Sequence, residues 1–262
     1  MQNFETITLD KSAGVATVTM NRPDVHNAFN EVMIADLTTC FEALNDDKDI
    51  RVIILQSAGQ SFSAGADINW MKSMVSATQD ENKADSERLA KLLRVINFNS
   101  KATIAKVQGL ALGGGVGLVC CCDIVVATDD AKFGLTEAKL GLVPAVISPY
   151  VVDAIGTRHA RRYFQTAEIF DASTAYRLGV VSELCSESEL DEKVSKQVKF
   201  LNSTGPYAKE IGKKLVMSVV GRTLPQQQKL DEYTTQVIAA VRVSDEGQKG
   251  LNAFLSKEKP QW

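Results

Sequence analysis

Two short loops rich in small residues are the parts of this chain whose composition could do chemistry. The first reads Ser-Phe-Ser-Ala-Gly-Ala-Asp-Ile over residues 61–68, and the second, residues 109–117, has glycine at five of its nine positions. Small residues let a ligand lie close to the backbone. Where such a loop leads into a helix, the first N–H groups lack intrahelical partners and can stabilise negative charge that develops on a reacting oxygen. We therefore expect both loops to contact a substrate.

Other kinds of active site find little support in the sequence. The chain has two histidines and no Cys-x-x-Cys pair, so we expect no metal site. It lacks the Gly-x-Gly-x-x-Gly and Walker A patterns that hold nucleotide phosphates, and the Gly-x-Ser-x-Gly elbow of serine hydrolases. We expect His26 to lie in a loop and His159 on the surface of a helix.

The composition is that of a soluble globular protein. Of 262 residues, 45% are hydrophobic and 23% charged, and the net charge of −3 gives no basic footprint for nucleic acid. The longest uncharged apolar stretch, between Lys106 and Asp123, is shorter than the ~20 residues of a membrane span. The first residues contain no apolar leader segment. Five cysteines, three of them consecutive, fit a reduced, cytoplasmic setting. We expect neither a nucleic-acid nor a membrane partner.

Elements of both kinds alternate along the first two thirds of the chain. The patterns predict strands at residues 14–20, 51–56, 103–107 and 124–127 and helices at 30–45 and 81–98, which indicates an α/β fold. No strand is predicted after about Cys185; the remaining segments, 187–202, 206–219, 224–241 and 244–256, are predicted to be helices. The only plausible boundary is Ser203–Pro206. We expect a core at residues 1–203 and a helical C-terminal region at 204–262.

The motifs, taken in order, closely resemble those of the enoyl-CoA hydratase/isomerase (crotonase) superfamily. The resemblance runs from about Phe4 to Lys257, and so many ordered motifs make a chance match negligible. It is carried by Asn21-Arg22-Pro23 with Asn27-Ala28, by Phe62–Asp67, Ala111–Gly115, Cys122-Asp123-Ile124 and Phe133–Glu137, and by the segment from Glu246-Gly247 to Phe254-Leu255. Asn69-Trp70-Met71 and residues 141–149 are most similar to bacterial methylglutaconyl-CoA hydratases.

The resemblance implies a fold, an assembly and an activity. The fold would be an α/β crotonase (ClpP-like) spiral of β-β-α units with a C-terminal helical trimerisation region, assembled as a homotrimer or a dimer of trimers. The activity would be that of an enoyl-CoA hydratase, which adds water across the 2,3 double bond of an acyl-CoA thioester. The substrate would be 3-methylglutaconyl-CoA or a related branched enoyl-CoA of leucine or isoprenoid-acid degradation. Coenzyme A belongs to the substrate, so no cofactor is expected.

The resemblance also assigns catalytic roles. The backbone N–H groups of Ala66 and Gly114 would form an oxyanion hole for the thioester oxygen, and Glu137 would transfer protons. Hydratases of the family commonly have a second glutamate two residues after the glycine run, where this chain has Gly117. One carboxylate could still accept a proton from water and return it to Cα.

Substrate-binding residues follow from the same resemblance. The acyl pocket would contain Trp70, Met71, Met74 and Ile147. A distal carboxylate on the acyl chain would need a cation, for which Lys72, Lys139, Arg161 and Arg162 are candidates. The C-terminal helix of a neighbouring subunit can contribute to the coenzyme A site. That site would be formed by Arg22, Val25, His26, Ala28, Ala64, Ala66, Asp67, Ile68, Asn69, Gly114, Phe254 and Lys257.

Two alternatives remain open. Because a Δ3,Δ2-enoyl-CoA isomerase only moves one proton between two carbons, the single carboxylate Glu137 would suffice for it. More remotely, some superfamily members bind RNA or lack catalytic activity. The helix at residues 81–98 carries Lys83, Arg88, Lys91 and Arg94, but acidic residues between them dilute the positive charge.

Overall fold

The computed structural model describes residues 4–262; residues 1–3, the first three of the expected core, lie outside the described part. Its larger sheet has the order β1-β2-β3-β4-β6-β9. β1 and β2 form an antiparallel hairpin, and each later pair of neighbours is parallel. The strands are β1 (Ile7–Ser12), β2 (Val15–Met20), β3 (Val52–Ser57), β4 (Ala102–Val107), β6 (Ile124–Thr128) and β9 (Glu183–Cys185).

A second, smaller sheet lies beside the first and consists of β5 (Leu110–Leu112), β7 (Lys132–Gly134) and β8 (Ile169–Asp171). Consecutive segments alternate between the two sheets and then enter a helix: β4, β5 and α4 (Gly114–Cys121), followed by β6, β7 and α5 (Ser148–Thr166). Isolated parallel bridges, Phe29 with Ala66 and Ser63 with Ala111, extend the second layer through the preceding loops. The chain is therefore a spiral of β-β-α units, as expected.

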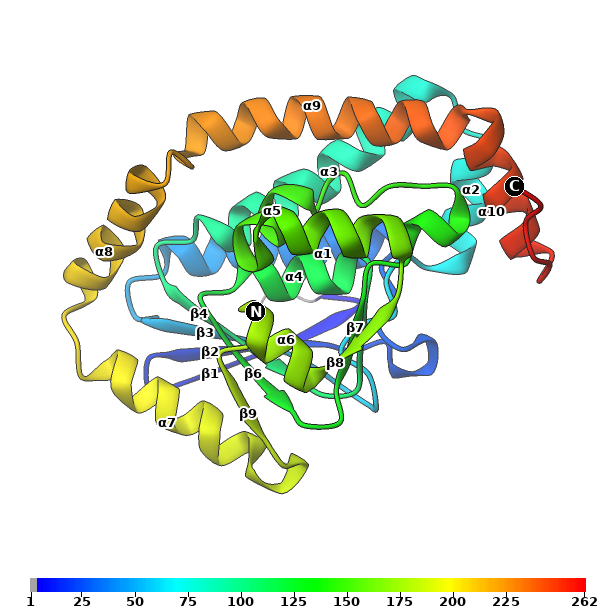
Figure 1. The fold of residues 1–262 in the computed structure, drawn as a ribbon. Coiled ribbons are helices and arrows are strands. Elements are labelled where there is room, and N and C mark those ends of the chain that lie inside the picture. The colour runs from blue at the N-terminus through cyan, green and yellow to red at the C-terminus, as the bar shows by residue number, and fades with distance from the viewer. Residues whose placement is uncertain (1–3) are drawn as a thin grey trace.

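Helices cover both faces of the larger sheet (Figure 1). On one face lie α1 (Glu31–Asp46), α3 (Gln79–Asn97), α4 and α5, which enclose the main hydrophobic core. On the other face α7 (Leu190–Asn202) packs through Leu190 and Val194 against Val52, Ile104 and Val126. β3 contributes Ile53 and Leu55 to the first core and Val52 to the second. The strand is therefore buried on both faces, which explains why its sequence is mostly apolar.

The C-terminal helices wrap around the core. From α7 the chain passes through α8 (Pro206–Val219) at one side of the molecule to α9 (Leu224–Val243), which crosses over α3, and ends in α10 (Asp245–Leu255) (Figure 1). The expected boundary at residues 203–206 falls at the connection between α7 and α8. α10 packs against α2 (Ile68–Val75) and the short turn η2 (Glu137–Leu140). The C-terminal region therefore reaches the helix that follows the loop at residues 61–68 and the turn that begins with Glu137.

The remaining short elements are η1 (Pro23–Val25), η3 (Glu187–Glu189) and α6 (Ala172–Leu178). The expected helices and the four expected strands are present with small shifts of their ends. The sequence patterns missed β1, β5, β7, β8 and β9 and the helix α6, and gave no bounds for α5. His159 lies exposed on α5, on the surface of a helix as expected.

Candidate active site

The two small-residue loops lie side by side. Ser63 N–H donates to the Leu110 carbonyl oxygen at 2.9 Å, and Leu112 N–H donates to the Ser63 carbonyl oxygen at 2.9 Å. Gly65 has a φ of +89°, and a Cβ at this position would lie only 3.1 Å from the Leu112 carbonyl oxygen. The small residues are thus needed because two backbones approach each other closely.

Each loop presents one free backbone donor to the same cavity. Phe29 N–H donates to the Gly65 carbonyl oxygen, and Asp67 N–H donates to the Phe29 carbonyl oxygen. The bridge between Phe29 and Ala66 therefore uses the residues on both sides of Ala66 and leaves the N–H of Ala66 free. Gly114 is the first residue of α4, where an N–H has no intrahelical acceptor. Within residues 4–262 neither N–H donates to a protein acceptor, and both residues line one cavity. This arrangement fits an anionic oxygen.

Glu137 opens η2 and lines the same cavity. A Cβ on Gly113 would lie 3.1 Å from Glu137 Oε1, so the carboxyl group rests against the turn that precedes Gly114. Glu137 Oε2 is buried and has no hydrogen-bond partner among the described residues. Burial raises the pKa of Glu137 to about 7. A carboxyl group with such a pKa can both accept and return a proton near neutrality.

The cavity has a volume of about 430 Å³ and mostly apolar walls. Trp70, Met71 and Met74 of α2 and Ile147 before α5 all line it, so the structure brings the four expected acyl-pocket residues together with Glu137. Leu89 and Ile238 extend the apolar wall. Such walls suit a hydrocarbon chain.

The position of the absent second glutamate has no space for a side chain. A Cβ on Gly117 would lie 2.4 Å from Cγ2 of Ile147. Ile147 therefore fills the volume that a glutamate at residue 117 would need, and this part of the cavity wall is apolar. Glu137 remains as the carboxyl group that shares the cavity with the two free N–H groups and rests against the turn before Gly114.

The expected coenzyme A residues divide into two groups. Ala64, Ala66, Gly114 and Phe254 line the cavity. The structure does not bring the others into the cavity wall, although they lie on or near the loops that frame it: Arg22, Val25, His26, Ala28, Asp67, Ile68, Asn69 and Lys257. Of these, Val25, His26, Ile68, Asn69 and Lys257 are exposed, and His26 lies in a loop as expected.

Arg22 and Asp67 hold the site loops together. Arg22 Nη2 lies 2.9 Å from Asp67 Oδ2, and Arg22 Nη1 donates to the Ala28 carbonyl oxygen at 2.6 Å. Asp67 also caps α2 by accepting from Asn69 N–H at 2.8 Å. Burial favours a higher pKa for Asp67, but the Arg22 and backbone hydrogen bonds outweigh it and lower that pKa. The pair thus fixes the loop that carries Ala66.

The C-terminal segment of the same chain closes one side of the cavity with Leu251, Phe254, Glu258 and Pro260. A Cβ on Gly250 would lie 2.2 Å from the Leu140 carbonyl oxygen, so α10 can approach η2 only with glycine there. The spacing of the glycines in α10 was a signal for this contact. Phe254 therefore lines the cavity of its own chain.

Arg242, on the last turn of α9, also lines the cavity, and sequence reasoning missed it. The expected helix ended at Val241, one residue earlier. The available signal was an arginine one turn after Ile238 on a buried helix face. Of the cations proposed for a distal carboxylate, Lys139 lines the cavity, whereas Lys72, Arg161 and Arg162 are exposed elsewhere.

The basic residues of α3 are each matched by an acid. Lys83 pairs with Glu87, Arg88 with Asp85, Lys91 with Glu42, and Arg94 with Asp231. The positive charge that an RNA-binding helix would need is therefore balanced along this face. Among the described residues, no helix is both long and apolar enough to cross a membrane, and no three acidic, cysteine or histidine side chains are arranged to hold a metal ion.

Comparisons with known proteins agree with this geometry. The sequence model of the enoyl-CoA hydratase/isomerase family matches residues 10–262. A crotonyl-CoA hydratase of Syntrophomonas wolfei is 30% identical over 258 residues, which cover 98% of this chain and 97% of that protein.

Two solved structures are similar over nearly the whole chain. One, an enoyl-CoA hydratase from Shewanella pealeana, has a TM-score of 0.81 at 40% identity and covers 99% of this chain and 96% of its own. The other, a putative enoyl-CoA hydratase/isomerase (crotonase) from Legionella pneumophila, has a TM-score of 0.81 at 42% identity and covers 98% and 99%. The expected crotonase-type fold is confirmed.

Proposed function

Because the chain belongs to the enoyl-CoA hydratase/isomerase family, we propose that it adds water across the 2,3 double bond of an acyl-CoA thioester. One observation carries the proposal. Glu137, whose pKa is raised to about 7, shares an apolar cavity with the unpaired N–H groups of Ala66 and Gly114. Hydration needs this combination, because a proton moves while negative charge develops on the thioester oxygen.

The mechanism uses these three residues. The thioester oxygen accepts hydrogen bonds from Ala66 and Gly114. Ionised Glu137 takes a proton from water as the water oxygen bonds to Cβ, and the π electrons move to the carbonyl oxygen to give an enolate. Glu137 then returns the proton to Cα, and the carbonyl re-forms. Water is added, and Glu137 ends ionised as it began.

A Δ3,Δ2-enoyl-CoA isomerase is the second candidate, and Gly117 is the observation that favours it. Ile147 fills the space of a second carboxyl group, so one carboxyl group must do all the proton transfer. Isomerisation takes a proton from one carbon and returns it to another, which one carboxylate can do. The resemblance of residues 69–71 and 141–149 to methylglutaconyl-CoA hydratases leads us to prefer hydration.

The finer substrate that we propose is 3-methylglutaconyl-CoA or a related branched enoyl-CoA of leucine or isoprenoid-acid degradation. The walls formed by Trp70, Met71, Met74 and Ile147 offer a branched acyl chain apolar contacts. We propose that coenzyme A lies along the Arg22–Ala28 and Ala64–Asn69 loops. No cofactor beyond the substrate's own coenzyme A enters this mechanism.

We also propose that the chain assembles as a homotrimer or a dimer of trimers. The support is the outer face of α8, where Tyr207, Leu215, Val216 and Val219 are more than half exposed. Apolar side chains in such a contiguous group on a helix are typical of a surface that another chain covers.

A parallel assay tests the function. Crotonyl-CoA, 3-methylglutaconyl-CoA and a 3-enoyl-CoA would be followed by the absorbance of the conjugated thioester and by product mass. We expect water addition to the two 2-enoyl esters, fastest with 3-methylglutaconyl-CoA. A protein that shifts the double bond of the 3-enoyl ester rapidly but adds no water would be an isomerase and would overturn the hydratase proposal.

A further inference from the structure

Arg242 is a cation at the wall of the acyl cavity that the proposed mechanism does not use. Its side chain is only 14% exposed. It lies beside Trp70 and Met74, with its guanidinium carbon 5.9 Å from the centre of the Trp70 ring. All three residues line the cavity that contains Glu137. A buried guanidinium normally has all its donors engaged, because removing an ion from water is costly.

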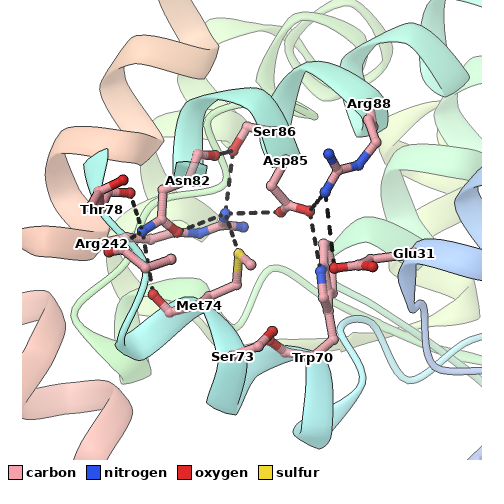
Figure 2. A network of polar contacts seen from close by, with 11 residues as sticks. Glu31, Trp70, Ser73, Met74, Thr78, Asn82, Asp85, Ser86, Arg88 and Arg242 are labelled. Atoms are coloured by element: carbon pink, nitrogen blue, oxygen red, sulfur yellow. Dashed lines mark hydrogen bonds and ion pairs between the residues drawn. The ribbon is translucent and has the colours of Figure 1, made fainter. Parts of the chain in front are cut away.

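Among residues 4–262, Nη1 is the only nitrogen of Arg242 that makes polar contacts with the protein. Nη1 lies 3.2 Å from Asp85 Oδ2, 3.3 Å from Ser86 Oγ, 3.4 Å from Asn82 Oδ1 and 3.6 Å from Met74 Sδ. Figure 2 shows these lines converging on a single nitrogen atom. Among the described residues, neither Nη2 nor Nε has an acceptor. Because a guanidinium has five N–H donors, three remain without a protein partner.

The charge of Arg242 is only partly balanced. Asp85 is buried and is shared: it accepts from Arg88 Nη2 at 2.7 Å and from Trp70 Nε1 at 3.2 Å, besides its longer contact with Arg242 (Figure 2). One buried carboxylate thus faces two guanidinium groups. Arg88 is half exposed and also has Glu31 at 4.0 Å, whereas Arg242 is largely buried and lines the cavity. The charged groups elsewhere on the cavity wall are Glu137, Lys139 and Glu258.

We propose that Arg242 determines substrate specificity by binding a carboxylate at the far end of the acyl chain. This inference rests on the proposed function, in which the thioester oxygen binds at Ala66 and Gly114. The planar guanidinium can offer Nη2 and Nε as a pair, the geometry that a carboxylate accepts in bidentate fashion. Trp70 and Met74 flank this group with apolar surface. The substrate class is therefore an enoyl-CoA whose acyl chain ends in a carboxylate.

Binding of two unreactive esters tests the proposal independently of catalysis. Glutaryl-CoA and pentanoyl-CoA have acyl chains of equal length, but only the first ends in a carboxylate, and neither has a double bond to hydrate. We expect calorimetry to give a dissociation constant for glutaryl-CoA about 10- to 100-fold below that for pentanoyl-CoA. Arg242→Gln should abolish this preference. Equal affinities in the wild-type protein would overturn the proposal.

Arg88→Gln is the matched control. It removes the other guanidinium group from Asp85 but leaves the cavity wall unchanged, so it should retain the preference for glutaryl-CoA. If Arg88→Gln loses the preference as fully as Arg242→Gln does, the network acts only through the fold and the proposal is wrong. Should Arg242→Gln not fold, the double variant Asp85→Asn/Arg242→Gln leaves no unpaired buried charge and is expected to lose the preference as well.

The outcomes separate this proposal from the proposed function. A protein that prefers glutaryl-CoA but adds no water to any enoyl-CoA would retain the Arg242 assignment and overturn the hydratase. A protein that hydrates crotonyl-CoA but binds glutaryl-CoA and pentanoyl-CoA equally would retain the hydratase and overturn the role of Arg242.

Discussion

Glu137 lies where the fold disfavours its negative charge. Its Oε2 is buried without a hydrogen-bond partner, and the surrounding walls are mainly apolar. An ionised carboxylate in this position is a stronger base than one in water, because desolvation destabilises the charged form. In the proposed mechanism the N–H groups of Ala66 and Gly114 instead stabilise the substrate oxygen. Basicity and charge stabilisation are thus assigned to different groups that meet in one cavity.

Replacing Glu137 by glutamine should remove proton transfer and leave binding nearly intact. We expect turnover of the best enoyl-CoA substrate to fall by at least ~10², because general acid–base catalysis contributes about that much. The dissociation constant of a saturated acyl-CoA should change little. Glu187→Gln, at an exposed position of η3, is the control and should behave as wild type. Turnover near the wild-type rate in Glu137→Gln would refute the assignment.

The activity should depend on pH through Glu137. The mechanism needs the ionised form, which predominates above a pKa of about 7. We therefore expect kcat/KM to fall about tenfold per pH unit below that value and to level off above it. An unburied glutamate would place this fall near pH 4.5. The measurement is kcat/KM with crotonyl-CoA from pH 5 to 9, and a flat profile down to pH 5 would contradict the role of Glu137 as the base.

The raised pKa also has a consequence for stability. The folded-state pKa of about 7 exceeds the ordinary value of 4.5, so the folded state binds the proton more tightly than the unfolded state. The contribution of Glu137 to stability is full below about pH 4.5 and is lost as the pH rises to about 7. The difference in unfolding free energy between Glu137→Gln and wild type should therefore shift in favour of the variant, by on the order of 3 kcal/mol, as the pH rises from 4 to 8. Denaturant titrations that give a pH-independent difference would contradict this expectation.

At this scale the sequence located most of the chemistry but missed one residue. Ala66, Gly114 and Glu137 occur in ordered motifs, and all three line the cavity. Arg242 has no motif, because its burial depends on Asp85 and Asn82, which lie more than 150 residues away in the chain. A single helical arginine does not reveal such a distant partner.

At the scale of elements, α4 and the segment before α5 form one packed unit. Gly117 lets Ile147 approach so closely that a Cβ would lie 2.4 Å from its Cγ2. The same contact excludes a second glutamate and puts an apolar side chain in the acyl pocket. The glycine is therefore a packing residue of α4 that also sets the chemistry of the site.

A double-mutant cycle tests this contact. Gly117→Ala should lower the unfolding free energy by about 1–3 kcal/mol through overpacking, although alanine suits a helix better than glycine. In the Ile147→Ala background the same change should cost at least ~1 kcal/mol less, because the Cγ2 at 2.4 Å is gone and only the Cβ of residue 147, at 2.9 Å, remains close. Additive effects at residues 117 and 147 would show that the two side chains do not compete for space.

Helices and strands were predicted correctly where the pattern of apolar residues extended over enough positions. β3 and β4 are six residues long and mainly apolar, and α1 has a continuous buried face from Met33 to Leu44. β5, β7, β8 and β9 have three residues each, too few to show a period, and exist because tertiary pairing completes them. In α5, Pro149 lies in the first turn and the non-helical Gly156 interrupts the helical pattern.

At the scale of the whole molecule, the last two helices, α9 and α10, bring residues of the C-terminal region into the cavity wall. α8 carries the chain from α7 along the side of the molecule, and α9 and α10 then return to the cavity (Figure 1). The cavity wall therefore combines residues from the loop after β3 with residues near the C-terminal end. The outer face of α8 remains exposed in the single chain, with Val219 77% and Leu215 61% accessible.

We expect this outer face of α8 to hold three copies together. Light scattering after size exclusion should give three or six times the chain mass of 28.5 kDa for the wild-type protein. Leu215→Glu/Val219→Glu should dissociate it, because two carboxylates would replace apolar side chains that each contribute about 1.5–3 kcal/mol when buried. Tyr176→Glu places one such carboxylate at an exposed residue of α6 and should leave the mass unchanged. Because α8 leads directly into α9, the dissociated variant should also show weaker acyl-CoA binding than Tyr176→Glu. A wild-type protein of 28.5 kDa, or a double variant that remains trimeric, would contradict the assignment of α8 as the interface.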